Sequence, residues 1–330
     1  MFLKKSRLFI VSALLMAGVN LQGQENVTEF LHMGVADAKI MSEVYLRPYG
    51  EMLGKSLNGG WYNSAGVHKL GGFDITFGVN MAMVPASGKN FDVSTLNFNT
   101  DLQVKNGSLS IAPTAAGEMP ENLRPIMQLN GKDVLTMPNG TGFDKLPAPM
   151  AQVSVGLPFH SEVSVRFIPS TSLGDAGKIN LYGFGVKHSI KEYLPFLKHA
   201  PFMRTSIMLG YTSMGSDVSV EAYKENGNAV GSNQSLDISS SAFTSRLLVG
   251  VNIPVLSVYT GVGYGSTNSD FALKGDYGSL GDNPFTLGYT TNGFDFNAGL
   301  RLRFGFIAIH GDYTFGDYSM VSAGIGLNFR

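Results

Sequence analysis

The strict alternation of apolar residues with polar or small ones restricts the fold of this chain more than any other feature. Residues 73–84 place Phe, Ile, Phe, Val, Met and Met at every second position, with Asp, Thr, Gly, Asn and Ala between them. Residues 294–304 and 321–329 repeat the pattern. A period of two is typical of β-strands that present one face to an apolar environment and the other to a polar one. We therefore expect an all-β protein.

The distribution of apolar residues indicates how such strands are used. The chain of 330 residues is 44% hydrophobic but only 15% charged, whereas soluble domains are roughly 25% charged. Apart from residues 8–19, no segment approaches the roughly 18 apolar residues that a transmembrane helix needs. A closed barrel is the other structure that satisfies all backbone polar groups within a bilayer. The sequence therefore predicts a transmembrane antiparallel β-barrel.

The links between predicted strands fall into two classes. Residues 157–160, 253–255 and 304–306 are tight turns, two of them containing a Pro that a central strand would not accommodate. Long links rich in Gly, Asn and Ser fall on the opposite side, as in outer-membrane barrels with short periplasmic turns. We count about 12 strands, or about 14 if residues 218–223 and 285–290 pair as an extension.

One predicted strand and one long link fit this pattern less simply. Residues 178–188 carry apolar side chains on both parities, which predicts a bulge near Leu181. The link near residues 112–149 is rich in Pro and Gly. It is interpreted either as a lid or docking loop, or as an exposed disordered loop.

The N-terminus resembles a secretory signal. Lys4, Lys5 and Arg7 precede the apolar residues 8–19, and residues 22–24 offer a cleavage region. Cleavage after residue 24 leaves 21 basic and 25 acidic residues, so no basic surplus suggests a nucleic-acid partner. The expected location is the outer membrane of a Gram-negative bacterium, in contact with its lipid. The absence of Cys excludes disulfides, thiolate metal sites and a lipid-modified N-terminal Cys.

Residues 25–68 form a separate segment in which apolar residues follow a helical period. Asn26 and Glu29 resemble a capping box, and Pro48 could start a second helix, so we expect two short helices. Such a segment can lie on the membrane, in the periplasm, or in the lumen as a plug. The candidate plug residues are Phe30, Leu31, Met41 and Tyr45. The chain is thus divided into a signal peptide (1–24), a helical segment (25–68) and a barrel (69–330).

Three stretches carry a resemblance to a known family. They are Leu57-Asn58-Gly59-Gly60-Trp61-Tyr62-Asn63-Ser64-Ala65, Leu70-Gly71-Gly72-Phe73-Asp74, and residues 185–195. With the helical N-terminus, they resemble the long-chain fatty-acid transporter (FadL-type) barrels, especially Bacteroidota relatives, over nearly the whole mature chain. The resemblance implies a channel for hydrophobic or amphipathic small molecules. Those transporters commonly carry Asn-Pro-Ala at the end of the plug, where this chain has Asn63-Ser64-Ala65.

Charged residues at inward parity form the strongest candidate site. We expect a luminal cluster of Arg166, Arg204, Arg246, Arg301, Arg303, Asp74, Asp295, His310 and Asp312. One interpretation is a structural network of ion pairs that fills a narrow lumen. The other is a path that selects anions or binds carboxylates, since guanidinium groups hold carboxylates bidentately.

Other functions find less support in the sequence. There is no H-E-x-x-H, G-x-S-x-G or P-loop motif, so we expect no catalytic residues, no metal and no cofactor. A soluble β-sandwich is a weaker alternative fold, and no repeat period supports a bladed array. A barrel that serves as a scaffold or docking component for other envelope proteins is the alternative to a transporter.

Overall fold

Ten antiparallel strands form a closed barrel in the computed structural model, which describes residues 27–172, 177–220, 222–225 and 227–329. The predicted signal peptide lies outside these residues. Around the wall the strands follow the order β1-β17-β16-β15-β14-β13-β10-β9-β8-β7. Their bounds are β1 Phe73–Met83, β7 Lys145–Leu157, β8 Ser161–Ser172, β9 Lys178–Ser189, β10 Met203–Ser219, β13 Ser232–Asn252, β14 Leu256–Asp276, β15 Thr286–Phe304, β16 Ile307–Phe315 and β17 Ser319–Phe329. The predicted antiparallel barrel is confirmed.

The first and last strands close the wall. Phe73 of β1 pairs with Phe329 of β17 on one side and with Val155 of β7 on the other. Closure supplies partners for backbone groups that an open sheet would leave free at its edges. It also places the start of β1 and the end of the chain at the same end of the barrel.

The predicted number of 12 to 14 strands is wrong, since the barrel has ten. Residues 218–223 and 285–290 were expected to pair as an additional extension. Instead β10 continues to Ser219 and β15 begins at Thr286, so residues 218–219 and 286–290 lengthen two existing strands. Strands β13 and β14 are each 21 residues long and extend well past the apolar exterior.

The bulge predicted near Leu181 does not lie in β9, but the pairing of β9 with β8 is irregular opposite Leu181. Strand β9 pairs with β10 in a continuous register, and buried positions alternate regularly with exposed ones along it. Ile179 and Leu181 point inward and belong to an apolar cluster, while Tyr182 and Phe184 point outward. The apolar residues on both parities of β9 thus result from an apolar part of the lumen and not from a bulge in that strand. The register shift lies in the neighbouring strand β8, between Ile168 and Thr171.

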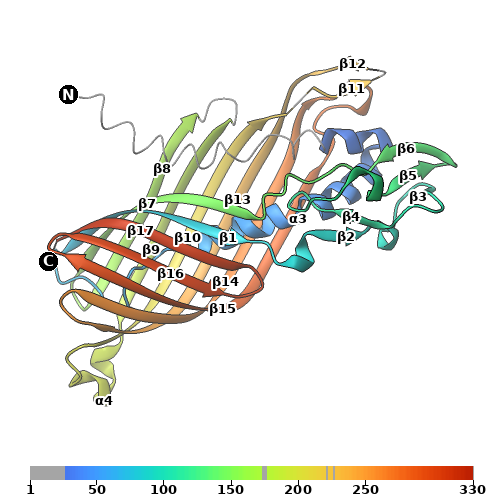
Figure 1. Ribbon diagram of the computed structural model, residues 1–330. Helices are drawn as coiled ribbons and strands as arrows, with labels where there is room; N and C mark the ends of the chain where they lie inside the picture. Colours follow the sequence, from blue (N-terminus) through green and yellow to red (C-terminus); the bar gives the residue numbers. More distant parts are fainter. Residues whose placement is uncertain (1–26, 173–176, 221, 226, 330) are drawn as a thin grey trace.

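The two ends of the barrel differ in their connections. At the turn end, which also holds Phe329, residues 157–161, 252–256 and 304–307 make the predicted tight turns. A longer link there carries η6 Lys191–Tyr193 and α4 Pro195–Lys198, which project below the wall (Figure 1). At the opposite end, the loop end, residues 84–144 join β1 to β7, and the hairpin of β11 Lys224–Glu225 and β12 Asn228–Ala229 joins β10 to β13.

The exterior of the wall between the two ends is apolar. Large apolar side chains alternate outward along every strand, including Phe77, Val165, Phe184, Leu209, Leu247, Val262, Leu300 and Ile325. An apolar surface of this extent around a closed barrel is typical of contact with lipid. Among the described residues, no helix has the length and apolar character that crossing a membrane requires.

A folded cap covers the loop end (Figure 1). It consists of residues 27–46 and 84–144, whose apolar side chains share one core, with Val27, Phe30 and Leu31 beside Val93 and Met127. The second part contains η2 Ala86–Gly88, β2 Asn90–Asp92, η3 Val93–Thr95, β3 Leu102–Val104, β4 Ile111–Pro113, η4 Glu121–Leu123, β5 Ile126–Leu129 and β6 Lys132–Thr136. The link predicted at 112–149 therefore lies mostly in the cap, and its last residues, from Lys145 on, belong to β7.

The N-terminal segment contains one long helix where two short ones were predicted. After helical residues 27–30 and η1 Leu31–Met33, Gly34 adopts φ +85°, and α3 Val35–Asn58 begins. Pro48 lies within α3 and does not end it. An interior Pro costs a helix about 3 kcal/mol. Packing on both sides of the residue, through Tyr45 in the cap and Met52 nearer the lumen, offsets this cost.

Candidate functional site

The C-terminal half of α3 and the residues that follow it occupy the barrel lumen. Helix α3 contacts β1, β7, β10, β13, β14 and β15, which lie around most of the wall. Glycines allow the closest approaches: a Cβ at Gly50 would lie 2.9 Å from Tyr289 Cβ, and one at Gly54 would lie 2.7 Å from Thr267 Cβ. Residues 50–68 thus run inside the barrel from the loop end to the turn end. We call them the luminal segment.

A buried ion network fixes the luminal segment to the wall at mid-height. Asp295 of β15 accepts hydrogen bonds from both terminal nitrogens of Arg246 of β13, one at 3.1 Å. Lys55 of α3 also donates to Asp295. The side chains of Arg246 and Asp295 are each 3% exposed. Because one carboxylate binds both the buried Arg246 of the wall and the partly buried Lys55 of the helix, Asp295 holds helix and wall together.

Trp61 is buried in the lumen below α3. Its ring lies against Gly183 and Gly185 of β9 and Gly210 of β10, where any Cβ would come within 3.2 Å of the indole. On the other side, the Arg166 guanidinium carbon lies 3.7 Å from the ring centroid. The wall glycines form a flat recess, and the guanidinium adds a cation–π contact.

Arg166 also binds the backbone of the luminal segment. Its terminal nitrogens donate to the carbonyl oxygens of Leu57 at 3.3 Å and Gly59 at 2.7 Å, and Nε donates to Gln152 Oε1 at 2.9 Å. These carbonyls lie where α3 ends, so they lack helical partners. Arg166 therefore serves as a side-chain cap supplied by the barrel wall.

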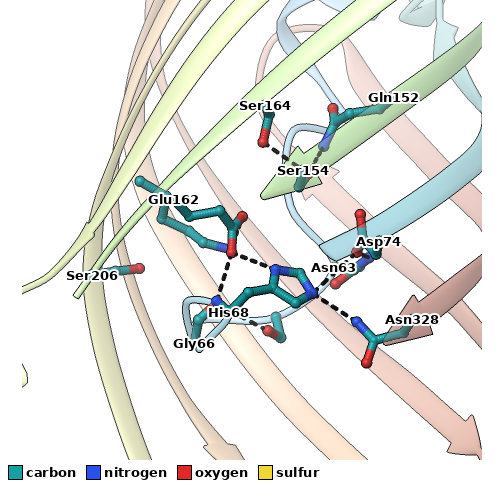
Figure 2. Close-up of polar contacts among 12 residues, drawn as sticks. Asn63, Gly66, His68, Asp74, Gln152, Ser154, Glu162, Ser164, Ser206 and Asn328 are labelled. Carbon is teal, nitrogen blue, oxygen red and sulfur yellow. Dashed lines mark hydrogen bonds and ion pairs between the residues drawn. The ribbon is translucent and has the colours of Figure 1, made fainter. Parts of the chain in front are cut away.

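His68 holds the luminal segment at the turn end (Figure 2). Its Nδ1 lies 2.7 Å from Glu162 Oε2, and its Nε2 lies 2.7 Å from Asn328 Nδ2. The backbone N–H of His68 donates to the same Glu162 oxygen at 2.9 Å. Lys187 neutralises Glu162 at 2.9 Å, while Asn63 donates to Asp74 at 3.1 Å. We call these six residues the latch, because they join the end of the luminal segment to β1, β8, β9 and β17.

The recess under Trp61 gives a direct prediction. In Gly210→Ala, the new Cβ would lie 2.6 Å from indole Cε2, so either Trp61 or the wall must shift. Overpacking of this kind costs about 1–3 kcal/mol. We expect a lower urea midpoint for unfolding in lipid vesicles and altered Trp fluorescence, since Trp61 is the sole Trp. Gly293→Ala, where a Cβ would meet nothing within 4 Å, is the matched control.

The predicted luminal charges lie in separate groups. Arg246 and Asp295 form an ion pair, and Arg301 and His310 are cross-strand neighbours on β15 and β16. Arg204 binds the backbone carbonyls of Pro201 and Met203 near the turn end. The remaining members are placed as follows: Arg166 beside Trp61, Arg303 on Asn328, Asp74 in the latch, and Asp312 on Tyr259 and Asn297.

The candidate plug residues Phe30, Leu31, Met41 and Tyr45 are buried in the core shared by the cap and the upper lumen. Tyr45 donates to the Asn139 carbonyl at 2.8 Å, and its ring lies 5.3 Å from that of Phe30. The side chains that anchor the lower lumen are instead Lys55, Trp61 and His68. Sequence analysis singled out the Gly59-Gly60-Trp61 stretch only as a family resemblance. No local pattern indicated which wall residues these side chains would meet.

The cap is fastened to the start of α3 by Asp37. Although burial raises the pKa of this carboxyl, hydrogen bonds from the side chains and backbone of Thr100 and Asn99 hold it below its ordinary value. A carboxyl whose pKa is lowered by folding stabilises the folded state fully at pH values above its ordinary pKa. This stabilisation is lost as the pH falls through the pKa of the folded state. We expect acid to loosen residues 93–104, seen as faster amide exchange. In Asp37→Asn exchange should be faster at neutral pH and less sensitive to acid.

Comparison with known proteins identifies a family without an assigned activity. The chain belongs to the family described as "Family of unknown function (DUF6588)", whose profile matches residues 3–329. No curated protein matches the sequence.

Several solved structures are distantly similar. The translocator domain of the autotransporter NalP from Neisseria meningitidis is 11% identical, with 80% of this chain and 89% of that chain covered and a TM-score of 0.36. Ail, the attachment invasion locus protein of Yersinia pestis, is 8% identical, with coverages of 79% and 98% and a TM-score of 0.29. A Pseudomonas aeruginosa FadL homologue is 10% identical, with coverages of 78% and 90% and a TM-score of 0.24. Likenesses this distant assign no activity to the chain.

Proposed function

We propose that this member of a family of unknown function is an outer-membrane barrel that passes hydrophobic or amphipathic small molecules through an opening in its wall. The turn end would face the periplasm and the cap would face outward. The luminal segment would act as the gate. The proposal keeps the substrate class that the FadL-type resemblance implies, and it rests on a separation between two neighbouring strands.

That separation, which we call the seam, lies between β7 and β8. The two strands pair only from Leu157 with Ser161 up to Gln152 with Arg166. Above this point the two strands do not pair with each other. Residues 145–151 of β7 pair only with β1, while Ile168, Thr171 and Ser172 of β8 pair with β9. Figure 1 shows the two strands diverging toward the loop end. β7 contains Pro147 and Pro149, which cannot donate to a ladder and are compatible with an edge.

Both sides of the seam carry apolar residues. On the outside these are Ala151 and Pro149 of β7 and Phe167 and Pro169 of β8, and Phe167 is 61% exposed. On the inside, Leu146 and Ile168 pack against a cluster that includes Leu53, Leu57, Ile179 and Leu181. The strands at the seam are unpaired, and apolar residues lie on both their inner and outer faces. A hydrophobic small molecule could therefore pass between the lumen and the bilayer without contacting water.

The test is to close the seam covalently. The chain has no Cys, so Ala151→Cys with Phe167→Cys can be bridged by a short bis-maleimide across the seam. Val153→Cys with Val165→Cys bridges paired residues just below it and is the matched control. The readout is entry of the hydrophobic dye N-phenyl-1-naphthylamine into intact cells that produce the protein.

We expect cells with the unmodified barrel to take up the dye faster than cells without it. Bridging the seam should remove most of this increase, while bridging the control pair should leave it. Equal uptake with the seam open and bridged would contradict the lateral route.

A scaffold is the second candidate, favoured by the occupied lumen and the folded cap. If the barrel only anchors other envelope proteins, dye entry will not exceed that of cells without the barrel. Stoichiometric partners should then co-purify with the intact chain and be lost when residues 84–144 are replaced by a short linker.

A further inference from the structure

Arg301 differs from the other four arginines of the predicted luminal set. Arg166, Arg204, Arg246 and Arg303 each donate at least one hydrogen bond to a protein acceptor. Arg301 is only 7% exposed, yet its Nε and Nη2 atoms are buried without a partner. Within the described part of the chain it also forms no ion pair within 4.0 Å.

The cross-strand neighbour of Arg301 also carries an unpartnered polar atom. In the backbone register of the wall, Arg301 lies opposite His310 on the next strand. His310 in turn lies opposite Gly324, and Gly324 lies opposite Gly78. His310 Nδ1 is buried without a partner. Gly324 leaves room for the imidazole to lie against the wall, because a Cβ there would lie 2.5 Å from His310 Cε1.

Among the described residues no carboxylate lies within 4.0 Å of a nitrogen of Arg301. Asp74 Oδ2 accepts from Asn63 at 3.1 Å, while Asp74 Oδ1 is buried without a partner. Glu162 pairs with Lys187 at 2.9 Å, and Asp312 accepts from Tyr259 at 3.3 Å. Arg303, the other cation close in sequence, binds Asn328. A buried guanidinium that no carboxylate contacts directly carries a large desolvation cost, so a directly bound negative charge would stabilise it.

We propose that Arg301, with His310, binds a small oxyanion, either a carboxylate or inorganic phosphate, in the lower lumen. The free Nε and Nη2 groups form one edge of the guanidinium, which matches two oxygens of such an anion. The His310 imidazole supplies a further donor. This site is independent of the lateral route, because it lies on β15 and β16, away from the seam.

The experiment measures binding of acetate and of inorganic phosphate separately, by ligand-observed magnetic resonance, to the refolded mature chain in detergent micelles. Arg301→Gln removes the proposed contact, and Arg303→Gln is the matched control because it removes a neighbouring cation on the same strand. Loss of a charge-assisted pair of hydrogen bonds corresponds to about tenfold or more in affinity. We expect that loss in Arg301→Gln and less than about a twofold change in Arg303→Gln.

The preferred anion identifies which oxyanion the site takes. Arg301→Lys keeps the charge but not the two-point edge, and it should also weaken binding. It provides the same comparison if Arg301→Gln does not refold. Equal affinities in the Arg301 and Arg303 variants would overturn the site, as would the absence of acetate and phosphate binding to the parent chain. Failure of dye uptake would not affect this test, since the assay requires no transport.

Discussion

Deleting residues 25–60 is expected to convert a barrel that conducts no ions into one with a stable open conductance. In the intact chain, α3 and the Leu57–Gly60 turn fill the lumen, and Arg166 binds their carbonyl oxygens. The wall closes through β1, β7 and β17 without these residues, so the barrel should still form. Single-channel recording in a planar bilayer measures the difference.

A shorter deletion provides the control. Removing residues 25–34 takes away part of the cap but leaves α3 and its contacts with the wall. We expect this variant to be as silent as the parent chain. Unchanged conductance after the longer deletion, in protein whose barrel is folded, would show that residues 25–60 do not block the lumen.

Replacing Asp295 by Ala should produce one of the largest losses of stability available from a single substitution. The change leaves Arg246 and Lys55 facing each other without their common carboxylate, and Arg246 is buried. Removing one member of a buried ion pair costs about 3–5 kcal/mol. Urea unfolding in lipid vesicles, followed by circular dichroism, measures the free energy of unfolding.

Asp133→Ala is the matched control for Asp295→Ala. Asp133 pairs with Lys105 at 2.6 Å, but both side chains are substantially exposed in the cap. Exposed pairs contribute about 0–1 kcal/mol. Equal losses in the two variants would mean that Asp295 does not hold the luminal segment to the wall.

The barrel itself could be predicted because its signal is local. Residues 73–84 alternate over consecutive positions, and tight turns such as Leu157–His160 interrupt the pattern where strands reverse. Lipid outside and polar groups inside impose this alternation on each strand separately. No knowledge of distant contacts was needed for these features.

What occupies the lumen could not be predicted in this way. The contacts of Trp61 with Gly183, Gly185 and Gly210 join residues more than a hundred positions apart. The apolar upper lumen also placed Ile179 and Leu181 inward, against the expected parity. Pro48 was interpreted as a break, because tertiary packing that supports a helix across a Pro leaves no local signature.

The predicted luminal charges could likewise be predicted only in part. Inward parity identified Arg246 and Asp295 as facing the lumen, and the two form an ion pair. Parity could not show that Lys55 from the helix completes the pair, nor that Arg301 is left without a protein partner. Which charges meet depends on the barrel radius, the strand register and the path of the luminal segment, all of which are long-range properties.

The most direct test of the central claim is disulfide trapping of the helix inside the barrel. In Gly54→Cys with Thr267→Cys, the two Cβ atoms would start 2.7 Å apart, and a shift of about 1 Å reaches the roughly 3.8 Å of a disulfide. Val262 points outward on the same strand, so Gly54→Cys with Val262→Cys is the control. We predict that the first pair oxidises in folded protein, with the loss of two hydrogens in the intact mass, while the control pair stays reduced. Thiols that remain free in the first pair, or a disulfide in the control, would contradict a luminal position for α3.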